Sequence, residues 1–191
     1  MAALSGLKVA VIVERGFEQS ELLEPRKALE AAGAEVDVIS PVEGKVTGCN
    51  AEEWGDDVDV DLPLKQAHPR EYDALLLAGG LINPDRLRTN ERAVQFIRTF
   101  SALSRPIAAI CHAAWMLIEA DVVRGKRLTS APSIKTDLKN AGAIWIDSEV
   151  VEDHGLVTAR KVDDIQAFIG KMIEVFAGAV GSRFNVSPSA P

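Results

Sequence analysis

The residues best suited to chemistry are neighbours, Cys111 and His112. The apolar run 107–110 predicts a buried strand, and helix-forming residues follow at 113–119. No Gly, Asn or Asp lies at the junction, so the backbone must bend sharply there. α/β enzymes expose a nucleophile in this way, and the N–H groups that open the next helix favour an anion at the sulfur. The pattern therefore predicts a reactive thiol at Cys111.

The same two residues also allow structural interpretations. A lone cysteine is often a small buried hydrophobe. A helix N-terminus and a nearby imidazolium would instead lower a thiol pKa from about 8.5 to roughly 3.5–7.5. Adjacent side chains on a turn diverge, so we do not expect His112 to reach the Cys111 sulfur easily. The alternative for His112 is a place at a subunit interface.

Composition limits the class of protein. The chain has 191 residues with a 47% apolar share and a formal net charge of -7. This length suits one domain, predicted at residues 1–180, followed by a Ser/Pro-rich flexible tail at 181–191. The negative charge and the scattered basic residues argue against nucleic acid as a main partner.

The apolar runs and the cysteine count bear on location. No run approaches the roughly 20 apolar residues of a membrane helix, so no membrane partner is expected. The first residues lack the pattern of a signal peptide. Cys49 and Cys111 could form at most one disulfide, and without a secretion signal we expect reduced thiols in the cytoplasm.

Strand-like and helix-like segments alternate along the chain. Apolar runs at 7–13, 34–40, 72–78 and 107–110 predict strands of a mostly parallel sheet covered by helices on both faces. Functional residues in such folds gather at the carboxyl ends of the strands. Glu18, the Gly79–Gly80 pair and Cys111 each follow a central strand. We therefore expect them at one rim of the sheet, although a loop glutamate such as Glu18 is more commonly solvated.

Several local features carry further expectations. Pro25 is awkward inside the helix predicted at 20–32, so its first turn should be irregular or it should begin near Leu22. Residues 58–62 alternate in a way that predicts a half-exposed hairpin. A second hairpin is expected from 143–151 and 156–159. Asn83-Pro84-Asp85 predicts a helix cap and first turn. The final helix is expected to begin with a capping box formed by Asp163 and Gln166 and to end at Gly178.

Four motifs together resemble those of the DJ-1/PfpI superfamily, in its PfpI-like intracellular protease and general stress protein branch. The likeness extends from about residue 7 to 176, and departs from the family where Ala113-Ala114-Trp115 follows the Cys-His pair in place of Gly-Pro. It implies a flavodoxin-like αβα sandwich, related to class I glutamine amidotransferases, in a homodimer or larger oligomer. The motifs are Gly16-Phe17-Glu18, Gly79-Gly80, Ala109-Ile110-Cys111-His112, and the run from Leu156 to Asp164 that contains Arg160.

The resemblance also implies roles for individual residues. Cys111 would be the nucleophile, Glu18 the carboxyl group that hydrogen-bonds its sulfur, and His112 the histidine of a triad. The acidic member of that triad would come from an adjacent subunit and is matched here by Asp85. The backbone N–H groups at Gly79–Gly80 and His112 match those that bind an oxyanion. If Glu18 faces the sulfur, repulsion should raise its pKa so that it donates to the sulfur.

Three functions remain open at this point. The first is a glyoxalase III or deglycase-type stress enzyme acting on small 2-oxoaldehydes such as methylglyoxal, or on their glycation adducts. The second is a cysteine peptidase with an intersubunit triad. The third is a redox-sensing or chaperone-like stress protein that uses oxidation of Cys111. No metal-ligand cluster and no dinucleotide loop is apparent, so no metal or cofactor is expected.

Overall fold

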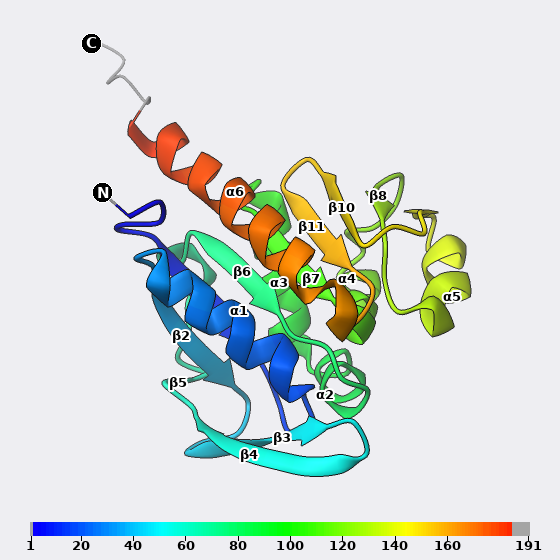
Figure 1. The fold of residues 1–191 in the computed structure, drawn as a ribbon, viewed down its shortest axis with the longest axis horizontal. Helices are drawn as coiled ribbons and strands as arrows, with labels where there is room; N and C mark the ends of the chain where they lie inside the picture. The colour runs from blue at the N-terminus through cyan, green and yellow to red at the C-terminus, as the bar shows by residue number, and fades with distance from the viewer. Residues whose placement is uncertain (1, 185–191) are drawn as a thin grey trace.

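A seven-stranded sheet forms the centre of the computed structural model, which describes residues 2–184 (Figure 1). The strands lie in the order β10-β11-β7-β6-β1-β2-β5, and neighbours are parallel except β10 with β11. The mostly parallel sheet predicted from the sequence is confirmed. Its strands are β1 (Lys8–Ile12), β2 (Glu35–Ser40), β5 (Leu62–Pro63), β6 (Ala74–Leu77), β7 (Ile107–Ile110), β10 (Val150–Asp153) and β11 (Leu156–Ala159).

Helices cover both faces of this sheet and complete the αβα sandwich (Figure 1). α1 and α6 pack together on one face, and α3 and α4 pack together on the other. Short 3-10 turns stand between several elements, at η1 (Pro69–Glu71), η2 (Cys111–Ala113), η3 (Pro132–Ile134) and η4 (Val162–Asp164). The α-helices are α1 (Gln19–Ala31), α2 (Ile82–Leu87), α3 (Glu91–Ala102), α4 (Ala114–Glu119), α5 (Lys135–Asn140) and α6 (Ile165–Phe184).

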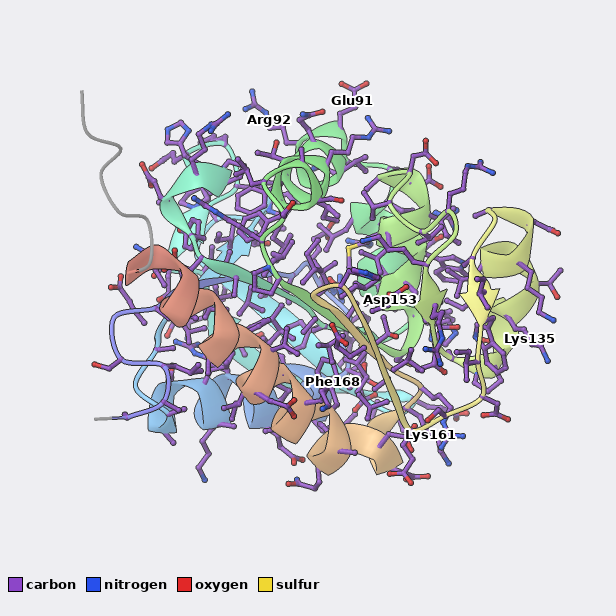
Figure 2. All side chains as sticks on the ribbon, turned by 90° about the horizontal axis from the view of Figure 1, so that it is seen from above. Glu91, Arg92, Lys135, Asp153, Lys161 and Phe168 are labelled. Atoms are coloured by element: carbon purple, nitrogen blue, oxygen red, sulfur yellow. The ribbon has the colours of Figure 1, made fainter. Side chains whose placement is uncertain are left out.

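Two buried apolar layers hold the sandwich together, one on each face of the sheet. Because successive strand residues point to opposite faces, Val11 packs in the layer under α1 and α6 while Ile12 packs in the layer under α3 and α4. Phe168 of α6 is fully buried in the first of these layers. Figure 2 shows charged side chains such as Glu91 and Arg92 pointing outward at the edge of the molecule. This burial on both sides is typical of a parallel sheet.

Two small sheets lie beside the main one. β3 (Lys45–Asn50) and β4 (Glu53–Asp59) pair as an antiparallel hairpin next to the carboxyl end of β1. The hairpin predicted in this region therefore exists, but its strands are centred earlier than 58–62. β8 (Arg127–Leu128) pairs with β9 (Ile144–Trp145). The second predicted hairpin is consequently built by β10 and β11 without residues 144–145.

Two local expectations were wrong. α1 begins at Gln19 and passes through Pro25 as a helix, so neither an irregular first turn nor a start near Leu22 is needed. Asn83 is inside α2 and is not a cap. Its fully buried amide donates to the carbonyls of Ala78 at 2.8 Å and Gly79 at 3.1 Å. Its amide oxygen accepts from the Glu14 N–H at 2.7 Å. Asn83 thus joins the end of β1 to the end of β6.

The last helix also differs at both ends from the expected one. η4 precedes it, and no capping box forms because Asp163 pairs with Lys161 and Gln166 donates to Glu24. α6 continues past Gly178 to Phe184, so residues 181–184 belong to the helix, while 185–191 of the predicted tail lie outside the described residues. Among the helices described, none is both long and apolar enough to cross a membrane.

Candidate active site

Cys111 occupies a strained turn directly after β7. Its φ angle is +63°, in the left-handed region that residues with a side chain rarely adopt. Such a conformation costs about 1–3 kcal/mol and persists only where the surrounding structure enforces it. The sharp bend predicted at this junction is therefore present. It brings the sulfur to the rim where β1, β6 and β7 end side by side.

The carboxyl group beside the sulfur belongs to Glu21, in the first turn of α1. Glu21 is 1% exposed and interacts with the Cys111 thiol and with the N–H groups of Gly79 and Gly80. Neither carboxyl oxygen has a partner in ideal hydrogen-bond geometry, so these contacts are close but poorly aligned. The expectation that Glu18 is the carboxyl at the sulfur is corrected accordingly, because α1 turns Glu21 toward Cys111.

Glu18 lies at the mouth of the same site and is half-buried. Its carboxylate accepts from the Ala51 N–H at 3.3 Å, and Ser20 Oγ lies 3.5 Å from its other oxygen. Its negative charge is one cause of the raised pKa of Glu21. Glu18 is thus part of the site, but it acts on the sulfur through Glu21.

The proton of Glu21 is the central electrostatic feature. Burial, followed by the charge of Glu18, raises the pKa of Glu21 to about 7. While Glu21 is ionised, burial and its charge raise the pKa of the Cys111 thiol, opposed by the N–H groups of His112 and Gly80. This rise in the thiol pKa is opposite to the lowering that the sequence predicted. A protonated Glu21 removes that repulsion and can donate to the sulfur, so the two groups titrate as a pair.

Gly79 and Gly80 let the loop after β6 approach this pair. A Cβ at Gly79 would lie 2.4 Å from Glu21 Oε2 and 2.8 Å from the Cys111 Cβ. A Cβ at Gly80, whose φ is +80°, would lie 2.6 Å from the backbone N of Glu18. The N–H of Gly80 acts on the sulfur together with the N–H of His112. Two backbone donors therefore face the reacting atom, as at an oxyanion-binding site.

His112 reaches the sulfur from the adjacent position. Its Nδ1 lies 3.2 Å from Cys111 Sγ, contrary to our expectation that the two side chains diverge. That expectation assumed an ordinary turn, whereas the left-handed backbone at Cys111 changes the relative direction of the two side chains. Burial lowers the pKa of His112, so its ring favours the neutral form, which can accept a proton.

The second ring nitrogen of His112 has a partner in the same chain. Its Nε2 lies 2.9 Å from the hydroxyl of Ser133, in η3. Asp85 is exposed in the first turn of α2, and its predicted contact with His112 of another subunit remains a prediction. Nothing in the sequence around Ser133 indicated its contact with His112.

The site opens into a cavity of about 300 Å³. Glu18, Glu21 and Gly80 line it from one side, and Cys111 lies in its wall with His112. The turn into α6 completes it, although sequence reasoning did not place that turn at the site. The turn contributes Lys161, Val162 and Asp163. Within residues 2–184 there is no group of three or more His, Cys, Asp or Glu side chains that could hold a metal ion.

Known proteins resemble this chain along most of its length. The model of the DJ-1/PfpI family matches residues 7–175. Protein/nucleic acid deglycase 2 of Escherichia coli is 44% identical over 163 residues, which cover 84% of this chain and 92% of that protein. General stress protein 18 of Bacillus subtilis is 41% identical over 165 residues, or 85% of this chain and 94% of the relative. The putative cysteine protease YraA of B. subtilis is 41% identical over 162 residues, or 84% and 93%.

Solved structures share the fold. Drosophila melanogaster DJ-1beta superimposes with a TM-score of 0.80 at 25% sequence identity, covering 95% of this chain and 99% of that one. This similarity agrees with the flavodoxin-like αβα sandwich described above.

Proposed function

The chain belongs to the DJ-1/PfpI family, and on that premise we propose that it is a cysteine-dependent stress-response enzyme with glyoxalase- or deglycase-type action. The names of its relatives, deglycase and putative cysteine protease, indicate an enzyme. The observation that carries the proposal is the position of Cys111 Sγ between the Glu21 carboxyl and His112 Nδ1. The substrate would be a small 2-oxoaldehyde such as methylglyoxal, or an early glycation adduct.

The first step would be addition of the Cys111 sulfur to the aldehyde carbon. A carbon–sulfur bond forms, and the thiol proton passes to the carbonyl oxygen to give a hemithioacetal. His112 is near enough to take that proton, because its Nδ1 lies 3.2 Å from Sγ. The N–H groups of Gly80 and His112 would stabilise negative charge on the oxygen.

A hydrogen shift between adjacent carbons would follow. A base removes the proton from the carbon bonded to sulfur, and the neighbouring carbonyl carbon receives a proton through an enediol. The product is a thioester of a 2-hydroxy acid on Cys111. Glu21 suits this transfer because its pKa of about 7 lets it accept and return a proton near neutral pH. Water then cleaves the thioester, releasing the hydroxy acid and restoring the thiol.

Turnover of methylglyoxal tests the proposal. Cys111→Ala should abolish formation of lactate, and Glu21→Gln should lower kcat by about 100-fold or more, the low end for a positioned acid–base group. Glu18→Gln should lower it less, since Glu18 acts on the sulfur through Glu21. Equal turnover by the parent and Cys111→Ala would refute the proposal. Equal losses in Glu18→Gln and Glu21→Gln would refute the role given to Glu21.

Peptide hydrolysis is the second candidate. The close Cys111–His112 pair and the two N–H groups that face the sulfur also suit acyl transfer. In that reaction Asp85 of a neighbouring subunit would orient His112. Assay of a peptide alongside methylglyoxal separates the two candidates, because a peptidase requires Cys111-dependent peptide cleavage and loses it in Asp85→Asn.

Redox sensing is a third function, favoured by the buried carboxyl beside the sulfur. A protonated Glu21 could hold a Cys111 sulfinate by hydrogen bonding. Mild peroxide should then add about 32 Da, two oxygens, to the Cys111 peptide. Absence of that species would count against this function.

We also propose that the protein associates with itself and works in the cytoplasm. Exposed apolar side chains gather beside the site, as expected of an interface between copies. These residues are Trp54, Leu81 and Ile82, which line a cavity of about 270 Å³ adjoining that of Cys111.

A further inference from the structure

Trp115 lies one turn after Cys111, against the ring of His112. The two ring centres are 5.2 Å apart at an angle of 50°. The indole Nε1–H donates to Asp137 Oδ2 at 2.9 Å, which fixes the ring to α5. The same short segment, residues 132–140, therefore holds both rings, because Ser133 contacts His112 and Asp137 contacts Trp115.

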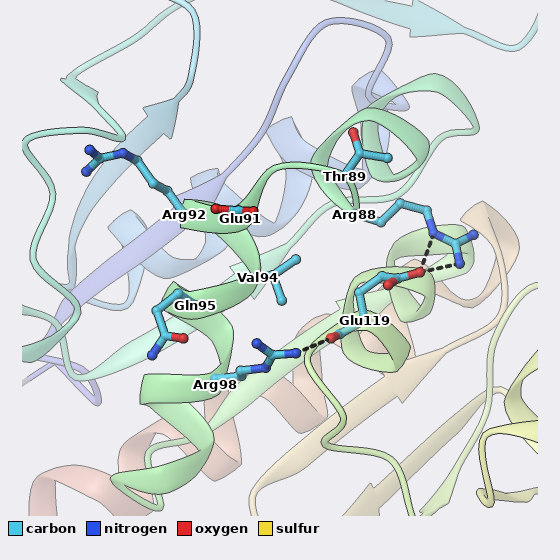
Figure 3. Close-up of a pocket in the computed structure, with 8 residues that line it drawn as sticks. All are labelled: Arg88, Thr89, Glu91, Arg92, Val94, Gln95, Arg98 and Glu119. Carbon is cyan, nitrogen blue, oxygen red and sulfur yellow. Dashed lines mark hydrogen bonds and ion pairs between the residues drawn. The ribbon is translucent and has the colours of Figure 1, made fainter.

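Arg88 restrains Trp115 from the C-terminal end of α2, which packs against α4. Its guanidinium carbon lies 5.2 Å from the centre of the Trp115 ring, within reach of a cation–π interaction. The guanidinium is itself held by two hydrogen bonds to Glu119 Oε1, at 2.6 and 3.0 Å. Glu119 closes α4, the helix that begins just after Cys111 and His112. Figure 3 shows this pair in the wall of a cavity of about 640 Å³.

A neighbouring arginine stabilises the same corner. Arg98 of α3 donates to the carbonyl of Glu119 at 2.9 Å (Figure 3). It also donates to the carbonyl of Ala120 at 3.2 Å. The C-terminal end of α4 is thereby fixed to α3. Glu119 thus has a defined position from which to orient Arg88.

We propose that Trp115, Asp137 and Arg88 are positioning residues that hold the His112 ring against Cys111 Sγ. The inference rests on the proposed function for its consequence in turnover, but the geometry concerns the thiol alone. His112 acts only while Nδ1 stays at its 3.2 Å distance from the sulfur, and a displacement of about 1 Å can cost a large factor in rate. Besides the exposed Ser133 hydroxyl that holds Nε2, the half-buried indole of Trp115 packs against the core and so supplies a second restraint on the ring.

Alkylation of Cys111 by iodoacetamide tests this directly, followed by mass spectrometry of the Cys111 peptide so that Cys49 does not interfere. If neutral His112 accepts the thiol proton, loosening its ring should slow the reaction. We expect Arg88→Ala and Asp137→Ala each to lower the rate by about tenfold, below the range for complete loss of a positioned base. Asp137→Asn should restore most of it, since the amide oxygen can still accept from the indole.

The decisive measurement repeats both substitutions in a His112→Ala background. If Arg88 and Asp137 act through His112, neither substitution should lower the rate further there. The same fractional loss in both backgrounds would overturn the proposal and indicate a merely structural role. Arg92→Ala is the matched control, because Arg92 lines the same cavity from α3 and its loss also removes a guanidinium (Figure 3).

These outcomes are separate from those of the proposed function. Alkylation requires only a reactive thiol, whatever the natural substrate. If the effects of the Arg88 and Asp137 substitutions do not depend on His112 while methylglyoxal turnover is normal, the positioning role alone is refuted. If those effects do depend on His112 but methylglyoxal is not turned over, the positioning role is supported and the proposed glyoxalase reaction is refuted.

Discussion

At the scale of single residues, one buried proton governs the site. Glu21 and Cys111 face each other with little solvent between them, and two negative charges at that distance would repel strongly. The pair therefore holds its protons to a higher pH than two exposed groups would. Where this proton lies decides whether the sulfur is a thiol or a thiolate, which makes Glu21 the residue that sets the reactivity of Cys111.

Replacement of Glu21 by Gln should change the pH dependence of stability. Burial and the charge of Glu18 raise the pKa of Glu21 from 4.5 to about 7. The folded state thus holds a proton that the unfolded chain loses, so this stabilising contribution is complete below about pH 4.5 and disappears as the pH rises to about 7. Urea unfolding should show the parent losing up to about 3 kcal/mol relative to Glu21→Gln across this range.

The control for this measurement is Glu24→Gln, on the exposed part of the same helix. Its stability should follow the parent at every pH. Parallel curves for the parent and Glu21→Gln would show that no proton is taken up at Glu21 on folding.

The sequence located the nucleophile but assigned the wrong carboxyl. Cys111 was predictable because a strand, a polar pair and a helix follow in direct succession. Glu18 and Glu21 are three positions apart, and only the observed start of α1 decides which one faces the sulfur. A usable signal was present: Glu21 shares a buried face of α1 with Leu22, Pro25 and Leu29, and a carboxyl in an apolar stripe is unusual.

At the scale of elements, the loop after β6 must pass close to both α1 and the turn after β7. The close approach is possible because Gly79 has no side chain, and a Cβ there would collide with both neighbours. Asn83 then fixes the loop through three hydrogen bonds to backbone groups just after the ends of β1 and β6. The Gly-Gly pair was predictable as a functional loop from its place after a strand, whereas the bracing role of Asn83 depends on contacts between segments about 69 residues apart.

Gly79→Ala should therefore damage the site and the fold together. The added Cβ would lie 2.4 Å from Glu21 Oε2 and 2.7 Å from the Ile110 carbonyl oxygen, which is backbone and cannot move easily. We expect a loss of about 1–3 kcal/mol in the free energy of unfolding, as for an overpacked core, with loss of Cys111 reactivity. Gly170→Ala is the control: apart from the adjoining backbone of α6, no atom lies within 4 Å of the added Cβ, so this change should stabilise α6 by about 0.5–1 kcal/mol. Equal stability of both variants would contradict this packing.

At the scale of the whole molecule, the layered fold followed directly from the sequence because strand and helix periodicities alternate. The apolar runs of β1 and β6 are enough to predict that both faces of these strands are buried. The position of the β3–β4 hairpin could be predicted less closely from the sequence, since turn residues interrupt it and no apolar run marks its strands. Yet this hairpin borders the site, and it carries Trp54, which is 52% exposed.

The exposed apolar surface beside the site should be where copies of the chain meet. Leu81 is 59% exposed and Ile82 36%, and both line one cavity with Trp54. Burial of such side chains between copies would stabilise an oligomer by roughly 25 cal/mol for each Å² removed from water, whereas an added carboxylate would oppose it. Light scattering should show an oligomer for the parent and a shift toward monomer for Leu81→Glu. Ile144→Glu, which changes a residue 54% exposed on β9, should leave the mass unchanged. A monomeric parent would end the proposal of self-association, and an unchanged mass for Leu81→Glu would move the interface elsewhere.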